Sequence, residues 1–262
     1  MKNLNHAIFT AWCVCIAVIV FLCLYPVMLS VTFRTNPQKR LLQLHRTWVK
    51  IFLKASGIKM RIDWYFEPQP NKGYVYCGNH FSSFDNFSMY NIIPNQFKTI
   101  GLEEIGKLPL YGRIFTKMHI LINRNSNTSK QKGLLEAMKC LDNGQSIVIA
   151  PEGGIRSLSP PLMAPFEDGA FILAIKKQVP IVPFLLETNH RILPEFPQKY
   201  IYRHTCEVTV LPALSTRGMS IADVSKLKER VFEMMQEVLG KEAEQHANLN
   251  TRSRWNLIRQ FR

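Results

Sequence analysis

Residues 73–87 read GYVYCGNHFSSFDNF, and this stretch decides the fold. The segment 74–78 is short, rich in aromatic and β-branched residues and closed by a glycine, which predicts a buried strand. The residues that follow predict a loop, and a helix is expected over 85–92. A strand that leads through a loop into a helix is the repeating unit of a largely parallel sheet with helices on both faces.

The same alternation continues along the chain from about residue 58. It predicts one α/β domain over residues 58–245, with a largely parallel or mixed sheet flanked by helices. Ligand sites in such folds lie in the loops beyond the strand ends. Further strands are expected at 58–66, 118–123, 146–150, 180–186 and 206–211, and further helices at 109–117, 128–143, 168–178 and 220–240.

His80 and Asp85 are the first candidates for chemistry. His80 falls in the loop after the strand at 74–78, and Asp85 falls near the start of the following helix. A carboxylate in that place can fix the tautomer of the imidazole and leave its other nitrogen free to accept a hydroxyl proton. Taken alone, the spacing also fits a loop histidine beside a helix-capping aspartate.

Two further strand ends carry arginines. Arg124 follows the strand expected at 118–123, and Arg156 follows the strand expected at 146–150. Arginine binds phosphate in a bidentate manner, and the glycines at 153 and 154 let backbone amides approach an anion closely. With the histidine and aspartate, these residues make a plausible site for a phosphate and a hydroxyl.

The order of these segments resembles the four sequence blocks of the 1-acylglycerol-3-phosphate acyltransferase family, within the glycerophospholipid acyltransferases. The blocks are matched by NHFSSFD at 79–85, ILINR at 120–124, PEGGIRS at 151–157 and VPIVP at 179–183. The resemblance implies that His80 is the general base and that Asp85 orients it. The residues that it implies for binding the phosphorylated acceptor are Arg124, Glu152, Gly153, Gly154 and Arg156.

The resemblance also implies the reaction. A fatty acyl group would pass from acyl carrier protein or acyl-coenzyme A to the free hydroxyl of 1-acylglycerol-3-phosphate, making phosphatidic acid for phospholipid biosynthesis. The expected partners are this lysophospholipid, the thioester donor and an anionic membrane surface. No metal and no cofactor other than the thioester co-substrate are expected.

Two departures from the family pattern leave a second acceptor open. The third block usually reads EGTR, whereas here EGGIR at 152–156 is one residue longer. Where the family often has paired lysines, this chain has Leu102 and Glu103, which leaves Lys98 and Lys107 as candidate substitutes. The alternative is O-acylation of a hydroxylated N-acyl amino acid, which makes an aminolipid.

Residues 1–57 are expected to attach the chain to a membrane. No charged residue occurs from 7 to 33, and a helix of this length covers about 40 Å against a hydrocarbon core of roughly 30 Å. Pro26 is expected to kink or end the first arm. A signal peptide is the competing interpretation, but the run is long and no cleavage site closes it. The basic residues that follow predict a cell (inner) membrane location with the catalytic domain on the cytoplasmic side.

Two more basic segments fit a membrane surface. Residues 38–56 have the apolar spacing of an amphipathic helix. Such a helix lies either in the membrane interface or on the surface of the domain. The tail at 246–262 is either a second membrane contact or a frayed basic end. The side chains of 38–56 that are expected to face phospholipid head groups are Lys39, Arg40, Arg46, Lys50 and Lys54.

Composition narrows the remaining classes of protein. The 262 residues carry 33 basic and 19 acidic side chains, a net charge of +14 that favours a polyanionic partner. A basic membrane-surface or nucleic-acid-binding protein without catalysis is therefore an alternative, but it leaves the His80–Asp85 block unexplained, and we expect no nucleic acid. The six cysteines contain no C-x-x-C pair, which argues against a zinc site. The chain also lacks the G-x-S-x-G turn of serine hydrolases.

Overall fold

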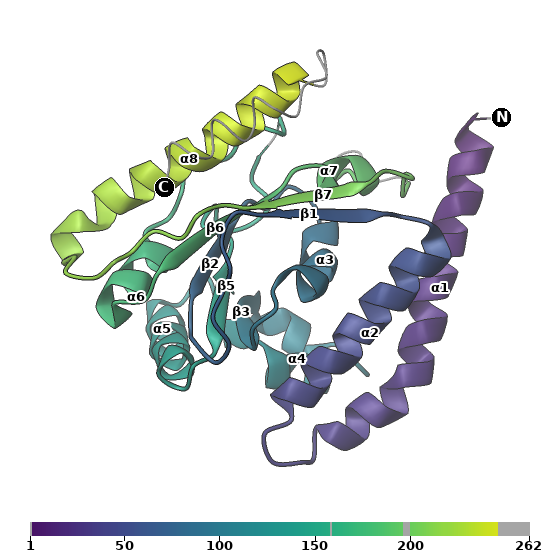
Figure 1. The fold of residues 1–262 in the computed structure, drawn as a ribbon. Coiled ribbons are helices and arrows are strands. Elements are labelled where there is room, and N and C mark those ends of the chain that lie inside the picture. The colour runs from purple at the N-terminus through teal and green to yellow at the C-terminus, as the bar shows by residue number, and fades with distance from the viewer. Residues whose placement is uncertain (1, 158, 196–199, 246–262) are drawn as a thin grey trace.

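The computed structural model describes residues 2–157, 159–195 and 200–245, so the predicted tail at 246–262 lies outside the described residues. Figure 1 shows a central sheet with helices on both faces and two long N-terminal helices packed along one side. The strands lie in the order β1-β7-β6-β2-β5-β3-β4. Their bounds are β1 Met60–Trp64, β2 Val75–Gly78, β3 Phe97–Leu102, β4 Ile120–Ile122, β5 Ser146–Ile149, β6 Ile181–Leu186 and β7 Cys206–Val210.

The sheet is mixed, as predicted. Neighbouring strands pair in parallel except β6 and β7, which pair antiparallel. Six strands confirm the sequence prediction to within a few residues, but β3 was not expected. Its sequence, FKTIGL, contains a lysine and a glycine and follows Pro94 and Asn95, so it lacks the continuous apolar character of the other central strands.

The helices cover the two faces of the sheet and bury a core on each. One core lies between the sheet and α5, α6 and α8, and the other lies between the sheet and α1 to α4. Alternate residues from Tyr74 through β2 divide between them, since Val75 and Cys77 face the first core while Tyr74 and Tyr76 face the second. The helices are α1 Lys2–Val31, α2 Gln38–Ser56, α3 Phe84–Ile92, α4 Gly112–Met118, α5 Asn127–Asp142, α6 Gly169–Lys177, α7 Asn189–Ile192 and α8 Val224–Gln245, with 3-10 turns η1 Glu103–Lys107 and η2 Ile221–Asp223.

The first helix, α1, runs antiparallel to α2 and continues through Pro26 to Val31. Of the two effects expected of Pro26, it therefore does not end the helix, and a kink there stays a prediction. Beyond the proline, Met28 and Val31 are buried in the core shared with α2, and this packing holds the last turns. The helix is long and apolar enough to cross a membrane, judged by length and composition alone. Its exposed large apolar side chains are Leu4, Ile8, Trp12, Val14, Val18, Ile19, Leu22 and Val27.

The second helix, α2, is sandwiched between α1 and the α/β domain. The indole of Trp48 donates a hydrogen bond to the carbonyl of Ala17 in α1 at 3.0 Å. The expectation that Arg46 faces phospholipid head groups was wrong, because its guanidinium turns inward to the end of α3. There it donates to the backbone carbonyls of Tyr90, Ile93, Pro94 and Asn95 over 2.6 to 3.1 Å, which satisfies groups that a helix end leaves without partners.

Candidate active site

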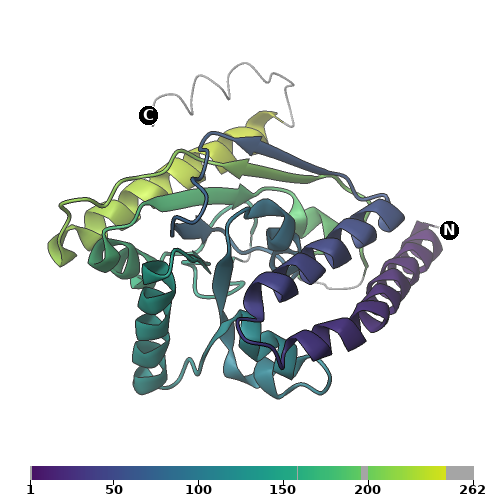
Figure 2. The same cartoon turned by 60° about the horizontal axis from the view of Figure 1, so that its bottom comes forward.

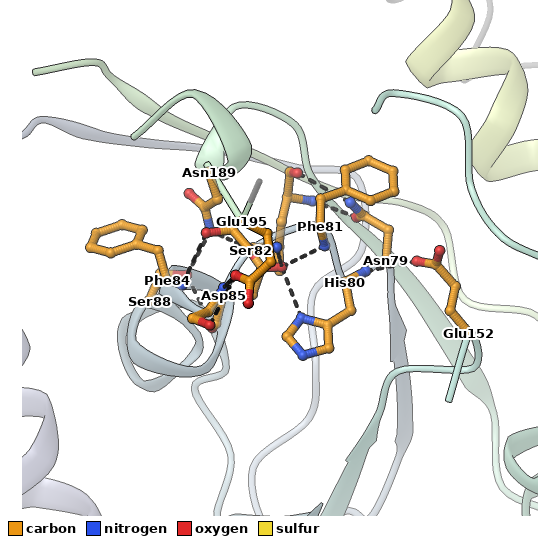
Figure 3. A network of polar contacts seen from close by, with 12 residues as sticks. Asn79, His80, Phe81, Ser82, Phe84, Asp85, Ser88, Glu152, Asn189 and Glu195 are labelled. Carbon is orange, nitrogen blue, oxygen red and sulfur yellow. Dashed lines mark hydrogen bonds and ion pairs between the residues drawn. The ribbon is translucent and has the colours of Figure 1, made fainter. Parts of the chain in front are cut away.

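His80 and Asp85 lie in direct contact at the carboxyl end of β2. The imidazole Nδ1 is 3.0 Å from Asp85 Oδ2, and because an ionised carboxylate only accepts, Nδ1 carries the proton. Figure 3 shows the second ring nitrogen pointing away from the carboxylate. The imidazole is 15% exposed whereas the aspartate side chain is 3% exposed. The pair therefore has the geometry of an oriented base with one nitrogen left for a substrate.

Asp85 is held by donors from the loop after β2 and from α7. Its Oδ2 atom also accepts hydrogen bonds from the backbone N–H groups of Phe81 and Ser82, both at 2.9 Å. Its Oδ1 atom accepts from Asn189 Nδ2 at 2.8 Å. Four donors offset the cost of burying a carboxylate and fix its plane relative to the imidazole.

Asn189 is a site residue that sequence reasoning missed. It lies in α7, 104 residues after Asp85, and is completely buried. Its amide orientation is set from the other side, because the thiol of Cys206 donates to its Oδ1 at 2.9 Å. Burial and the nearby carboxylates, among them Asp85, raise the pKa of Cys206 far above its usual range, so the thiol keeps its proton and remains a donor. No local pattern marks such a residue, since only the fold brings it to Asp85.

Replacing Asn189 by leucine is expected to lower kcat about tenfold, because Asp85 Oδ1 loses its side-chain donor and the carboxylate is held less firmly against His80. Measuring kcat at saturating substrates tests this. Asn95→Leu is the matched control, because Asn95 bonds Tyr76 and backbone carbonyls away from the site and its loss should leave kcat near the wild-type value. An unchanged kcat in a folded Asn189→Leu protein would contradict the assignment.

Glu152 supports the backbone of the site and does not face substrate. Its Oε1 atom accepts the backbone N–H of His80 at 2.8 Å, and its Oε2 atom accepts the N–H of Ala164 at 2.8 Å. The side chain is fully buried, and burial raises its pKa, while the two N–H groups act in the opposite direction. With both oxygens occupied and no exposed surface, its placement does not fit the acceptor-binding role that the family resemblance implies.

The side chains of Arg124 and Arg156 lie against Gly154 and Gly153, the two glycines of the loop that follows β5. A Cβ atom built on Gly153 would lie 3.3 Å from Arg156 Cζ, and one built on Gly154 would lie 3.1 Å from an Arg124 Nη atom. Both glycines have positive φ, +74° and +151°, which a side chain would strain. The structure thus brings together four of the predicted acceptor-binding residues, and the glycines form the floor on which the guanidinium groups rest. Arg156 also pairs with Glu167 at 2.9 Å.

Adding a methyl group at Gly154 is expected to weaken acceptor binding. Gly154→Ala strains the backbone and displaces the Arg124 guanidinium, so we expect KM for the anionic acceptor to rise about tenfold, the loss of roughly one charge-assisted hydrogen bond. Gly240→Ala is the matched control, because a Cβ there meets nothing within 4 Å and its helix tolerates alanine. An unchanged KM in Gly154→Ala would argue against a binding role for Arg124.

A cavity of about 570 Å³ opens beside His80 and runs over the face of the sheet toward β3. His80, Arg124, Gly153 and Gly154 line it, whereas Glu152 and Arg156 do not. Much of the remaining wall is apolar and aromatic, as an acyl chain requires. Those side chains are Trp48, Phe87, Met89, Leu102, Ile105, Phe115, Ile122, Val148, Ile149, Phe184 and Leu186.

A chain of polar side chains also lines part of this wall. Thr99 contacts His119 Nδ1 at 2.5 Å, and His119 Nε2 contacts the hydroxyl of Tyr90 at 3.1 Å. Tyr111 contacts Tyr90 and reaches His45 Nε2 at 3.3 Å, while His45 Nδ1 donates to a carbonyl one turn earlier in α2. Burial lowers the pKa of His119 to about 3 and of His45 to about 4, so both rings are neutral and the cavity wall is uncharged there.

The two lysines considered as substitutes for the missing family lysines do not line the cavity. Lys98 pairs with Glu136 of α5 at 2.8 Å, and Lys107 pairs with Glu103 at 3.2 Å. Leu102 does line it. Arg124 is therefore the one lysine or arginine in the cavity wall, within the part of the chain that the structure describes. In that same part, no three histidine, cysteine or acidic side chains are grouped so that they could hold a metal ion.

Comparisons with known proteins identify several that this chain resembles. The chain matches the family model described as Acyltransferase over residues 61–187, which includes His80, Asp85, Arg124 and the glycine turn. It is 27% identical to mouse 1-acyl-sn-glycerol-3-phosphate acyltransferase alpha over 198 residues, which is 75% of this chain and 67% of the mouse protein.

It is also 32% identical to a 1-acyl-sn-glycerol-3-phosphate acyltransferase of Chlamydomonas reinhardtii over 148 residues, which is 56% of this chain and 44% of that protein. The chain thus spans between about half and two thirds of the length of these relatives. Among solved structures, the 1-acyl-sn-glycerophosphate acyltransferase PlsC from Thermotoga maritima has the same fold. Its TM-score is 0.75 at 18% identity, covering 96% of this chain and all of that one.

Proposed function

We propose that the chain is an acyltransferase that acylates the free hydroxyl of 1-acylglycerol-3-phosphate, because it matches the acyltransferase family model over residues 61–187 and resembles 1-acyl-sn-glycerol-3-phosphate acyltransferases. The product is phosphatidic acid, and the donor is a fatty acyl thioester of acyl carrier protein or coenzyme A. The observation that carries the proposal is the 3.0 Å contact between His80 and a fully bonded Asp85 in the wall of a largely apolar cavity. The resemblance to enzymes also argues against the non-enzymatic alternative.

The reaction needs a base, an anion site and a place for a fatty chain. His80 takes the proton of the acceptor hydroxyl through its free nitrogen, and the hydroxyl oxygen attacks the thioester carbonyl. The carbon–sulfur bond breaks, and the imidazolium returns the proton to the leaving thiolate. Arg124 pairs with the anionic head group, and the apolar cavity wall receives a fatty chain. Asp85 keeps the imidazole in the required tautomer throughout.

A second acceptor keeps the same chemistry. One guanidinium in the cavity wall suits a carboxylate, which takes one bidentate partner, at least as well as a phosphate dianion. The apolar Leu102 in that wall stands at a position where the family often has lysine. Both observations favour a hydroxylated N-acyl amino acid as the alternative acceptor.

A membrane location follows from the proposed substrate and from α1. The described residues leave the apolar face of this helix exposed, which suits the interior of a lipid bilayer. The basic residues after the helix favour placing the α/β domain at the cytoplasmic surface of the cell membrane.

The test is a panel of acceptors and donors with the full-length protein in lipid vesicles. Lysophosphatidate and an N-(3-hydroxyacyl) amino acid are each offered with acyl-coenzyme A and with acyl carrier protein thioester, and the products are separated by mass. Transfer to lysophosphatidate supports the proposal. Transfer to the amino-acid acceptor alone would replace it with the alternative, and transfer to neither would overturn both.

A further inference from the structure

The loop between η1 and α4 exposes two leucines. Leu108 is 52% exposed and Leu110 is 57% exposed. Leu110 also has a φ of +65°, a left-handed conformation that is sterically unfavourable for any residue with a Cβ. A large apolar side chain that is both exposed and held in an unfavourable backbone conformation gains nothing from packing within the chain, which points to a role outside it.

This loop is fixed against the membrane-type helix α1. The next residue, Tyr111, turns inward and its ring lies 6.0 Å from that of Phe21 in α1. The turn is closed by the N–H of Gly112, which donates to the carbonyl of Leu108 at 2.9 Å. The loop is therefore rigid, with Tyr111 directed into the protein and both leucines exposed to the outside.

The start of α4 joins this loop to the end of α1. Arg113 Nε donates to Thr32 Oγ1 at 3.0 Å, and its Cζ lies 3.9 Å above the ring of Phe33. Phe33 is 69% exposed. Figure 2 shows the end of α1 beside α4 at the same end of the molecule. The exposed apolar face of α1 thus continues through Phe33 toward the two leucines.

We propose that Phe33, Leu108 and Leu110 form a second lipid-contact surface, which continues that of α1 and seats the mouth of the cavity on the bilayer. The inference rests on the proposed function, because it takes membrane lipid as the source of the acceptor. Lys107 and Arg113 flank the leucines and suit anionic head groups. Isolated exposed leucines are ordinary, but two that adjoin a lipid-type helix, one of them with a left-handed backbone, are not.

The position of the loop connects this surface to catalysis. Ile105 precedes the loop and Tyr111 follows it, and both line the cavity. A lysolipid that leaves the bilayer beside the leucines therefore enters the cavity without its acyl chain crossing water. The surface serves delivery of the lipid to His80 and takes no part in the chemical step.

The direct test is photo-cross-linking of the full-length protein on vesicles of phosphatidylethanolamine and phosphatidylglycerol. A benzophenone amino acid replaces Leu110 in one variant and Leu135 in the control, because Leu135 is 58% exposed on α5, away from α1. We expect lipid adducts from position 110 and none from position 135. Absence of lipid adducts at 110, or adducts to a second protein chain there, would overturn the proposal.

The kinetic test separates lipid delivery from chemistry. Leu110→Glu is expected to lower turnover of long-chain lysophosphatidate embedded in vesicles about tenfold, since one leucine no longer inserts. Turnover of a short-chain, water-soluble lysophosphatidate should be unchanged, and Leu135→Glu should change neither. Equal loss on both acceptors would contradict a delivery role. If the wild-type protein acylates neither acceptor, the proposed function fails, while the cross-linking result still decides whether the loop contacts lipid.

Discussion

Replacing His80 by alanine is expected to lower kcat for acyl transfer about 10²–10⁴-fold, the contribution of general-base catalysis. The imidazole is the group that Asp85 orients in the cavity, and without it the acceptor hydroxyl keeps its proton while it attacks. Binding of the acceptor should persist, because Arg124 and the apolar wall remain. The measurement is product formation in vesicles at saturating acceptor and donor.

The control for this substitution is His204→Ala. His204 is exposed and does not line the cavity, so its removal should leave kcat within a factor of two or three, as usual for surface changes. Both variants should keep the melting temperature of the wild type within a few degrees. Substantial turnover by a folded His80→Ala protein would show that another group acts as the base.

The second large effect is expected from Asp85→Asn, with kcat reduced about 10³-fold or more. Four donors converge on the two carboxylate oxygens of Asp85. An amide keeps one oxygen and presents its own N–H groups to donors, so His80 loses its oriented tautomer whichever way the amide turns. The mismatch also leaves buried N–H groups without partners, which should cost about 1–3 kcal/mol of stability.

Two measurements separate these consequences of Asp85→Asn. Denaturant unfolding reports the stability loss, and kcat under conditions where the variant is folded reports the catalytic loss. Asp142→Asn is the control, because Asp142 lies in a surface ion pair with Lys177 and should change stability by less than about 1 kcal/mol. A folded Asp85→Asn protein with near-normal kcat would remove the orienting role from this residue.

The local sequence pattern was sufficient to predict where the strands end and that His80 and Asp85 lie close together. A strand that ends in a polar loop before a helix brings His80 and Asp85 within reach by geometry alone. The parallel arrangement then brings Arg124 and the β5 glycines to the same edge of the sheet. These parts of the site depend on short-range structure and on one rule of topology, so the sequence predicts them.

Other parts of the molecule depend on contacts that no local pattern carries. Asn189 reaches Asp85 only because α7 packs against α3. Glu152 has the residue type of an acceptor ligand, but burial gives it two backbone N–H groups to satisfy. Arg46 lies on an amphipathic helix next to a membrane-type segment, yet the end of α3 offers it four carbonyl groups. In each case tertiary structure supplied the partner that determines the role.

The hydrogen bond from Trp48 to Ala17 has a practical consequence for handling this protein. Trp48 also forms part of the cavity wall, so α1 indirectly supports the compartment that we propose for the fatty chain. A shortened version that begins after α1 would keep His80 and Asp85 but lose the hydrogen bond that holds Trp48 in the cavity wall. Harsh detergents that strip α1 from α2 would inactivate the enzyme in the same way, which favours native lipid discs for purification and inhibitor screening.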